Sequence, residues 1–216
     1  ACAPFRRLHL CNKNMVKMDT NNNDSSNAKH NLLLDVCLAA NYEAQSLIRY
    51  HPQYQEKYGD SQICTVLARS FADIGDIVRG RDLYLGNKKK NQTKREQLDD
   101  KLKDIFGDIY KELTKNGKKE EIETRYKDGK DPNYYQLRED WWTANRATIW
   151  KALTCSKELD NSSYFRLTCV TGQGPSVANH YCRCNDDKPD NDKVNTDPPT
   201  YFDYVPQYLR WFEEWA

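Results

Sequence analysis

Lysine side chains crowd into one part of this sequence, where they could attract anionic groups. Residues 87–119 hold 11 Lys and Arg against 6 Asp and Glu, a local excess of +5, although the whole chain has a net charge of only +1. A flexible lysine loop meets sulfate groups without a fixed geometry, but many proteins have such a loop as an ordinary solvated surface. Arg6 and Arg7 are a weaker candidate with an equally plausible structural role. The residues that would bind an anion in the basic stretch are Lys88, Lys89, Lys90, Lys94, Arg95, Lys115, Lys118 and Lys119.

The eight cysteines are the second set of reactive residues. An even number at long spacings indicates disulfide bonds formed in an oxidising compartment. Zinc is the alternative, since His180, Cys182 and Cys184 could offer three ligands. The second close pair that a zinc finger or ribbon needs is missing, however. We therefore expect disulfides, and neither a metal nor a cofactor.

Residues for catalysis are present, but not in a catalytic pattern. A cysteine nucleophile needs a histidine base, and none of His9, His30, His51 and His180 lies in a recognisable catalytic context. The run Gly172-Gln-Gly174-Pro-Ser176 lacks the spacing and the preceding strand of a nucleophile elbow. The sequence favours a protein that is not an enzyme.

Composition excludes several further classes. The 14 Tyr, 6 Phe and 5 Trp exclude a disordered polar chain. The nearly neutral net charge argues against a nucleic-acid partner. The longest apolar run, Leu32 to Ala40, is interrupted by Asp35 and is too short to cross a bilayer. We expect no membrane contact by this domain itself.

Apolar residues recur at helical spacing in five stretches. One helix spans residues 31–50 and ends at His51-Pro52, and a second follows Ser61 as far as Val78, with a bend or break near Gly75. A third runs from the Thr93–Glu96 capping box to Gly117. A fourth starts at Asp131-Pro132 and ends at Leu153, a fifth starts near Pro206, and residues 156–200 are irregular. The sequence predicts a mainly α, disulfide-stapled bundle of about five long helices with long irregular loops.

The tryptophans and one charge pair are expected to be structural. Trp141, Trp142 and Trp150 share the fourth helix, where core packing is favoured over a role as exposed receptor anchors. Asp76 and Arg79 are one turn apart and predict an ion pair.

Four segments of the sequence are similar to the Duffy-binding-like domain, alpha class, of the Plasmodium falciparum erythrocyte membrane protein 1 variant antigen family. They are CAPFRRLHLC at 2–11, ARSFADIGDIVRGRDLY at 68–84, REDWWTANRATIWKALTC at 138–155 and PQYLRWFEEWA at 206–216. The loops at 12–30, 86–92 and 186–200 resemble the family's variable blocks.

This resemblance implies a domain organisation and a disulfide pattern. Residues 1–30 would be the loop-rich end of a first subdomain and residues 31–216 the central helical subdomain, with the third subdomain absent. The family's pattern implies that Cys64 pairs with Cys169 and Cys37 with Cys155, and leaves Cys2, Cys11, Cys182 and Cys184 open.

The resemblance also implies a role outside the parasite. The domain would lie on the surface of the infected red cell, in the extracellular part of a membrane-anchored protein. It would bind a host-cell receptor or a heparan-sulfate-like glycan, and its variation would evade host antibodies. The alternative is a structural spacer, with neighbouring domains binding the receptor. The sequence does not identify the receptor or the oligomeric state.

Overall fold

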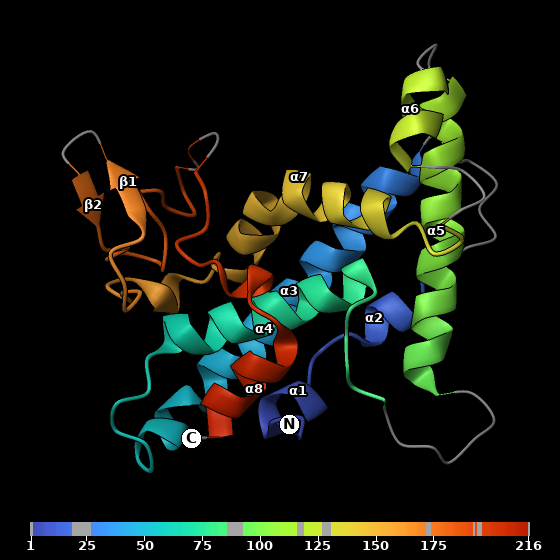
Figure 1. Ribbon diagram of the computed structural model, residues 1–216. Coiled ribbons are helices and arrows are strands. Elements are labelled where there is room, and N and C mark those ends of the chain that lie inside the picture. Colours follow the sequence, from blue (N-terminus) through green and yellow to red (C-terminus); the bar gives the residue numbers. More distant parts are fainter. Residues whose placement is uncertain are drawn as a thin grey trace.

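The computed structural model describes residues 2–18, 27–85, 93–115, 119–126, 131–171, 174–191, 193 and 196–215. The described part of the chain is mainly helical, as expected (Figure 1). Its helices are α1 (Phe5–Leu8), α2 (Lys13–Val16), α3 (Ala28–Gln55), α4 (Ile63–Arg79), α5 (Lys94–Lys115), α6 (Lys119–Tyr126), α7 (Tyr135–Leu153) and α8 (Gln207–Trp215). The short helical turns η2 (Lys157–Leu159) and η3 (Phe202–Tyr204) join them, and β1 (Cys169–Thr171) pairs antiparallel with β2 (Gly174–Ser176).

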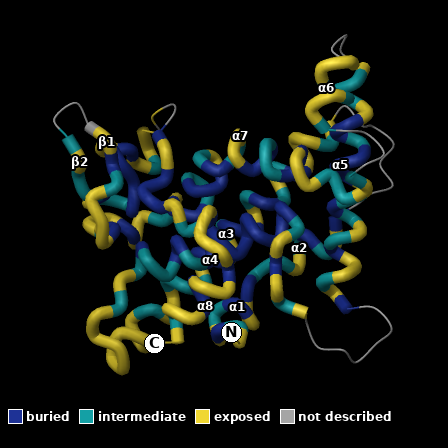
Figure 2. The backbone as a smooth tube through the Cα atoms, in the orientation of Figure 1, coloured by how far each residue is buried: buried dark blue, intermediate teal, exposed yellow. Residues whose placement is uncertain are grey.

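Helix α4 lies at the centre of the bundle, against α3 and α7. Figure 2 shows buried residues concentrated where these three helices meet. Phe71 of α4 packs its ring 5.0 Å from the ring of Trp142 and 5.2 Å from that of Trp150. Leu137 and Trp141 are also buried, so the predicted core role of the tryptophan-rich helix is confirmed.

Three predicted helix ends or breaks are wrong. Helix α3 continues through Pro52 to Gln55, because a proline in the last turn costs only one backbone hydrogen bond. Helix α4 is unbroken at Gly75, where the missing side chain makes room for the Trp142 ring. Helix α7 begins at Tyr135 instead of after Asp131, whose carboxylate accepts from the Asn133 N–H at 3.1 Å in a preceding turn.

The start of α5 is as predicted. The Thr93 N–H donates to Glu96 Oε2 at 2.7 Å, and the Glu96 N–H donates to Thr93 Oγ1 at 3.2 Å. This reciprocal pair is a capping box, which satisfies two backbone donors that the first helical turn leaves free. The predicted end at Gly117 lies outside the described residues. The sequence predicted neither α1, α2 and α6 nor the short hairpin of β1 and β2, and α2 lies within the stretch 12–30 that was expected to be a loop.

Two disulfide bonds are present among the described residues, and the expected pairs are wrong. Cys64 is bonded to Cys182 and Cys169 to Cys184. Cys169 lies on β1, and the hairpin brings it to Cys184 and leaves Cys182 beside α4. Cys37 and Cys155 are both free thiols, as are Cys2 and Cys11.

The N-terminal segment packs directly on the bundle. Helix α1 contacts α4, and α2 contacts both α3 and α5. Helix α8 lies beside α1 and α4 (Figure 1), and the Trp215 indole donates to the Cys2 carbonyl at 2.9 Å. The division into subdomains at residue 30 stays a prediction.

Candidate functional site

The predicted anion-binding residues do not form one cluster. Lys94 and Arg95 begin α5, whereas Lys115 ends it and Lys119 begins α6. Since a helix rises about 1.5 Å per residue, Lys94 and Lys115 are separated by roughly 30 Å along the helix. The described members of the set therefore divide between the two ends of α5. The other members of that set, Lys88, Lys89, Lys90 and Lys118, lie outside the described residues.

Neighbouring groups engage most of the described cations of this set. The Arg95 guanidinium donates to the Asp82 carbonyl at 2.6 Å. Lys115 pairs with Glu112 at 3.9 Å, and Lys119 pairs with Glu123 at 3.6 Å. Helix α5 contains six Lys and Arg and also six Asp and Glu, so its own net charge is zero. The local positive excess therefore belongs mainly to the lysines next to the helix ends.

A buried network of arginines and aspartates joins the chain's terminal segments to α4. Arg6 of α1 donates from Nη2 to Asp73 at 2.7 Å and to Glu214 at 2.9 Å. From the other side, Arg210 of α8 donates to the same Asp73 at 2.7 Å. We call the following residues the arginine–aspartate network: Arg6, Arg7, Asp73, Asp76, Arg79, Asp82, Arg146, Asp203 and Arg210.

The network is structural, and it decides between the two roles left open for Arg6 and Arg7. Their side chains are 7% and 5% exposed, and both are bonded to aspartates, so neither faces a solvent-borne anion. The predicted pair of Asp76 and Arg79 is present at 2.9 Å. Arg146 and the Trp142 indole both donate to the Asp203 carboxylate at 2.9 Å, which fixes η3 against α7.

Burial and nearby arginines set the carboxyl pKa values in this network. Burial alone would raise the pKa of Asp73, but Arg6 and Arg210 outweigh it, so this pKa is held below its usual value. Burial outweighs Arg210 and Arg79 at Asp76 and raises its pKa to about 6. The pKa values of Asp73 and Asp76, which lie one turn apart on α4, are therefore shifted in opposite directions.

Sequence reasoning missed most of this network, although a signal for it was present. Between Leu67 and Val78 apolar residues lie on more than one face of α4, and a helix that is apolar all round is buried. Aspartates on such a helix must be paired. Two of the arginines that pair with them come from distant segments: Arg6 lies 67 residues before Asp73 and Arg210 lies 137 residues after it.

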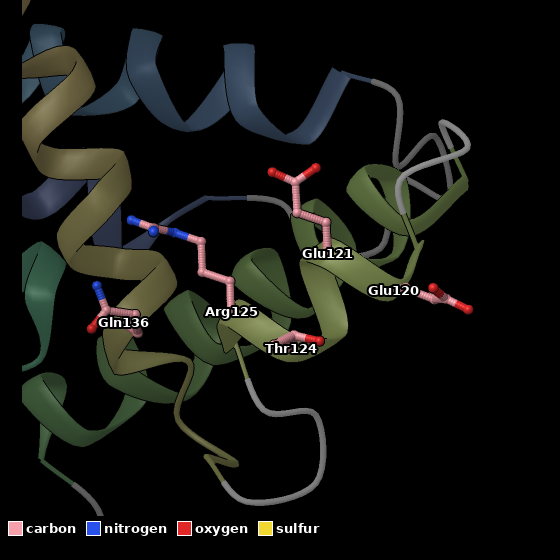
Figure 3. A pocket seen from close by; sticks show the side chains of 5 residues that line it. All are labelled: Glu120, Glu121, Thr124, Arg125 and Gln136. Atoms are coloured by element: carbon pink, nitrogen blue, oxygen red, sulfur yellow. The ribbon is translucent and has the colours of Figure 1, made fainter.

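A cavity of about 760 Å³ lies between α6 and α7 (Figure 3). Its polar groups largely satisfy one another: Arg125 Nε donates to Asp140 at 2.7 Å, and Gln136 donates to Asp140 at 3.1 Å. Glu120 and Glu121 complete an acidic lining. This cavity does not suit an anionic ligand.

Two general properties complete the description. Among the described residues, no group of three or more His, Cys, Asp or Glu side chains could hold a metal ion. In the same part of the chain, no helix is long and apolar enough to span a membrane.

Comparisons with known proteins identify related domains. A family model described as the Duffy binding domain matches residues 1–210. The NTS-DBL1(alpha-1) domain of Plasmodium falciparum membrane protein 1 (PfEMP1) from the varO strain is 42% identical, with a TM-score of 0.71 over 100% of this chain and 43% of that chain. The varO double domain of NTS-DBL1-alpha and CIDR-gamma is 41% identical, with a TM-score of 0.72 over 100% of this chain and 27% of that one.

A second class of the same protein is also similar. The ICAM-1-binding PfEMP1 IT4var13 DBLbeta domain is 33% identical, with a TM-score of 0.65 over 97% of this chain and 41% of that chain. The chain therefore spans less than half the length of these solved relatives. None of the curated proteins matches it.

Proposed function

The chain belongs to the Duffy binding domain family, in its PfEMP1 alpha class, and from this premise we propose that it is an adhesion domain that binds a host-cell receptor or a sulfated glycan. In this proposal it is displayed on the infected red cell, its loops are exposed to host antibodies, and it catalyses no reaction. The observation that carries the proposal is the likeness to a DBLbeta domain whose name records ICAM-1 binding.

The architecture supports this proposal. The arginine–aspartate network and the two disulfides hold a rigid centre. Rigid scaffolds that present variable loops are a common solution for recognition, because a loop can change without loss of the fold. For a sulfated glycan, we assign the contact to Lys88, Lys89, Lys90, Lys94 and Arg95.

One observation favours the alternative of a structural spacer. The described helix of the basic region, α5, has no net charge, and Lys103, Lys111 and Lys115 pair with carboxylates on the same helix, Lys103 with Asp99 at 3.1 Å. If Lys88, Lys89 and Lys90 are likewise ordinary surface lysines without a ligand, neighbouring domains would supply the receptor contacts.

Heparin retention by the folded chain tests the proposal. Replacement of Lys88, Lys89, Lys90, Lys94 and Arg95 by Ser should abolish most retention, while the helical circular dichroism stays unchanged. Retention should also fade as salt rises, since exposed charges are screened beyond about 8 Å at physiological ionic strength.

The other end of α5 supplies the matched control. Lys115→Ser with Lys119→Ser removes two exposed lysines roughly 30 Å from Lys94 along the helix, and should leave most retention intact. Equal losses in both variants would show a diffuse charge effect without a site. If the parent chain is not retained even at low salt, and binds nothing on a host-receptor array, the spacer function is favoured.

A further inference from the structure

Segments from opposite ends of the sequence lie side by side against α4. Figure 1 shows α1 next to α8, with the labels N and C close together, and both helices contact α4. Arg6 donates from Nε and Nη2 to the two carboxylate oxygens of Glu214, each at 2.9 Å. The Trp215 indole donates to the Cys2 carbonyl at 2.9 Å. We call Cys2, Arg6, Glu214 and Trp215 the α1–α8 clasp.

The ion pair of the clasp is largely shielded from water. The Arg6 side chain is 7% exposed and that of Glu214 is 13% exposed. Burial alone would lower the pKa of Arg6, but Asp73 and Glu214 outweigh it and hold this pKa above its usual value. Two parallel hydrogen bonds between charged groups are among the strongest in proteins, and water competes little with a buried pair. The clasp therefore joins firmly two residues that are 208 positions apart in the sequence.

The two sides of the clasp are anchored unequally. Arg6 also donates to Asp73 at 2.7 Å and to Ser70 Oγ at 2.9 Å, so it keeps two partners on α4 when Glu214 leaves. Glu214 is the partly exposed member of the pair, and water can solvate its carboxylate once it is released. Opening at this point leaves no buried charge without a partner, which is the costly step in breaking a buried ion pair.

Further inside α8, separation from α4 would be more costly. Arg210 donates to Asp73 at 2.7 Å and also binds Asp76, and the Trp211 indole donates to Asp73 at 3.3 Å. The side chains of Arg210 and Asp73 are 2% and 0% exposed. Pulling Arg210 away removes a partner from two buried aspartates at once. The last turn of α8 can therefore open more easily than the turn that carries Arg210.

From this arrangement we infer that the α1–α8 clasp is a mechanical latch, which opens first when tension is applied between residues 2 and 215. Because these two points are adjacent, the tension separates α1 from α8 one contact at a time, and it reaches Arg210 only after Glu214 is released. Arg6 stays bonded to α4 in the opened state, in position to bind Glu214 again when the tension falls. The inference goes beyond the proposed function, since it holds whether this domain or a neighbouring one binds the receptor.

The Cys64–Cys182 bond limits how far the chain extends after the latch has opened. This bond joins residues separated by 118 positions, so tension passes through it and bypasses the residues between the two cysteines. All of α7 and most of α4 lie in that bypassed part. The loaded path consists of residues 2–64 and 182–215, roughly 95 residues, which extend to about 330 Å, whereas the fully reduced chain extends to roughly 740 Å.

Single-molecule force measurements on the 216-residue chain test this inference. Handles are joined enzymatically to the two ends, which leaves the free cysteines unmodified. We expect a small, reversible opening at low load, before extension to about 330 Å. Glu214→Gln should raise the rate of the first opening under a fixed load about tenfold, because the amide keeps the shape of the carboxylate and loses the charged pair. Trp215→Phe, which removes one neutral hydrogen bond, should raise it about threefold.

Two controls distinguish a latch from an ordinary contribution to stability. Glu213→Gln changes an exposed neighbour on α8 and should leave the opening rate unchanged. With the handles moved to Gly59 and Lys111, tension bypasses the clasp, so Glu214→Gln should have no effect. Both attachment points tolerate a handle, since a side-chain carbon at Gly59 meets nothing within 4 Å and the Lys111 side chain is 68% exposed.

Three results would overturn the latch. The first is an equal opening rate for Glu214→Gln and Glu213→Gln when tension is applied at the ends. The second is the same effect of Glu214→Gln with both placements of the handles. The third is a parent chain whose first event is complete extension to about 330 Å. Extension well beyond this length before reduction would overturn the limit that Cys64–Cys182 sets.

Discussion

The arginine–aspartate network and the α5–α6 arm, which consists of helices α5 and α6, use the same charged residue types for opposite purposes. In the network, Asp73 is fully buried and receives bonds from α1 and α8. In the arm, pairs such as Lys111 with Asp108 join neighbouring turns of one helix at the surface. The first arrangement fixes distant segments of the chain, whereas the second contributes little beyond solubility. Charge composition therefore says nothing about role until burial and sequence separation are known.

Removing one aspartate from an ion pair in each region should give the largest difference in the free energy of unfolding between the two regions. Asp73→Ala removes the carboxylate that the buried guanidinium groups of Arg6 and Arg210 share, and leaves Arg6 with Glu214 and Arg210 with Asp76. A buried charge that loses its partner costs about 3–5 kcal/mol of unfolding free energy. Asp108→Ala, which breaks an exposed pair on α5, should cost no more than about 0.5 kcal/mol.

Urea unfolding followed by circular dichroism measures both changes. The comparison between the regions would be wrong if the two variants lost similar stability. Asp73→Asn is a useful third variant, since it retains the shape and one acceptor oxygen and should recover part of the loss.

The pH dependence of stability should also distinguish the regions. The pKa of Asp76 is about 6 in the folded chain, above its unfolded value of 3.8, so folding favours the protonated form. The chain should therefore lose stability as pH rises from about 4 to 6, by on the order of 2–3 kcal/mol from this group. Asp140 of α7, whose pKa is lowered mainly through Arg125 of the arm despite partial burial, should contribute stability that is lost as pH falls below its unfolded pKa.

Asp76→Asn isolates the first effect because asparagine does not titrate. The difference in unfolding free energy between this variant and the parent should shift in favour of the variant between pH 4 and 6, and stay constant above pH 7. A difference that instead shifts in favour of the parent as pH rises, mainly below about pH 4, would mean that Arg79 and Arg210 lower the pKa of Asp76.

The sequence predicted the helical class, the tryptophan core and the capping box because each depends on local spacing. Thr93 and Glu96, for example, need only be three residues apart. The disulfide partners and the network could not be predicted in this way, since Cys64 and Cys182 meet only when α4 and the hairpin region are packed together. The separation of the basic residues could not be predicted for a related reason: Lys94 and Lys115 are near in sequence but lie at opposite ends of α5.

Two glycines in helix interiors offer the finest test of how the regions differ. A side-chain carbon added at Gly75 of α4 would lie 2.7 Å from Trp142 Cζ2, which is too close for two carbon atoms. The Trp142 ring cannot move away without disturbing Phe71, which packs against it. We expect Gly75→Ala to lose about 1–3 kcal/mol of stability through overpacking. The same carbon at Gly107 of α5 would meet the Tyr134 side chain at ordinary contact distances, 3.4 Å from the hydroxyl and 3.7 Å from Cε2 and Cζ of the ring.

Gly107→Ala should therefore gain about 0.5–1 kcal/mol, because alanine is the better helix former and the Tyr134 side chain can give way slightly. Thermal unfolding of the two variants would show shifts of opposite sign. Equal losses would mean that α5 is packed against its neighbours as tightly as α4. A gain at Gly75 would mean that the Trp142 ring can move within the core. Opposite signs would establish that the centre of the bundle resists even one added methyl group, whereas helix α5 beside the basic stretch tolerates it.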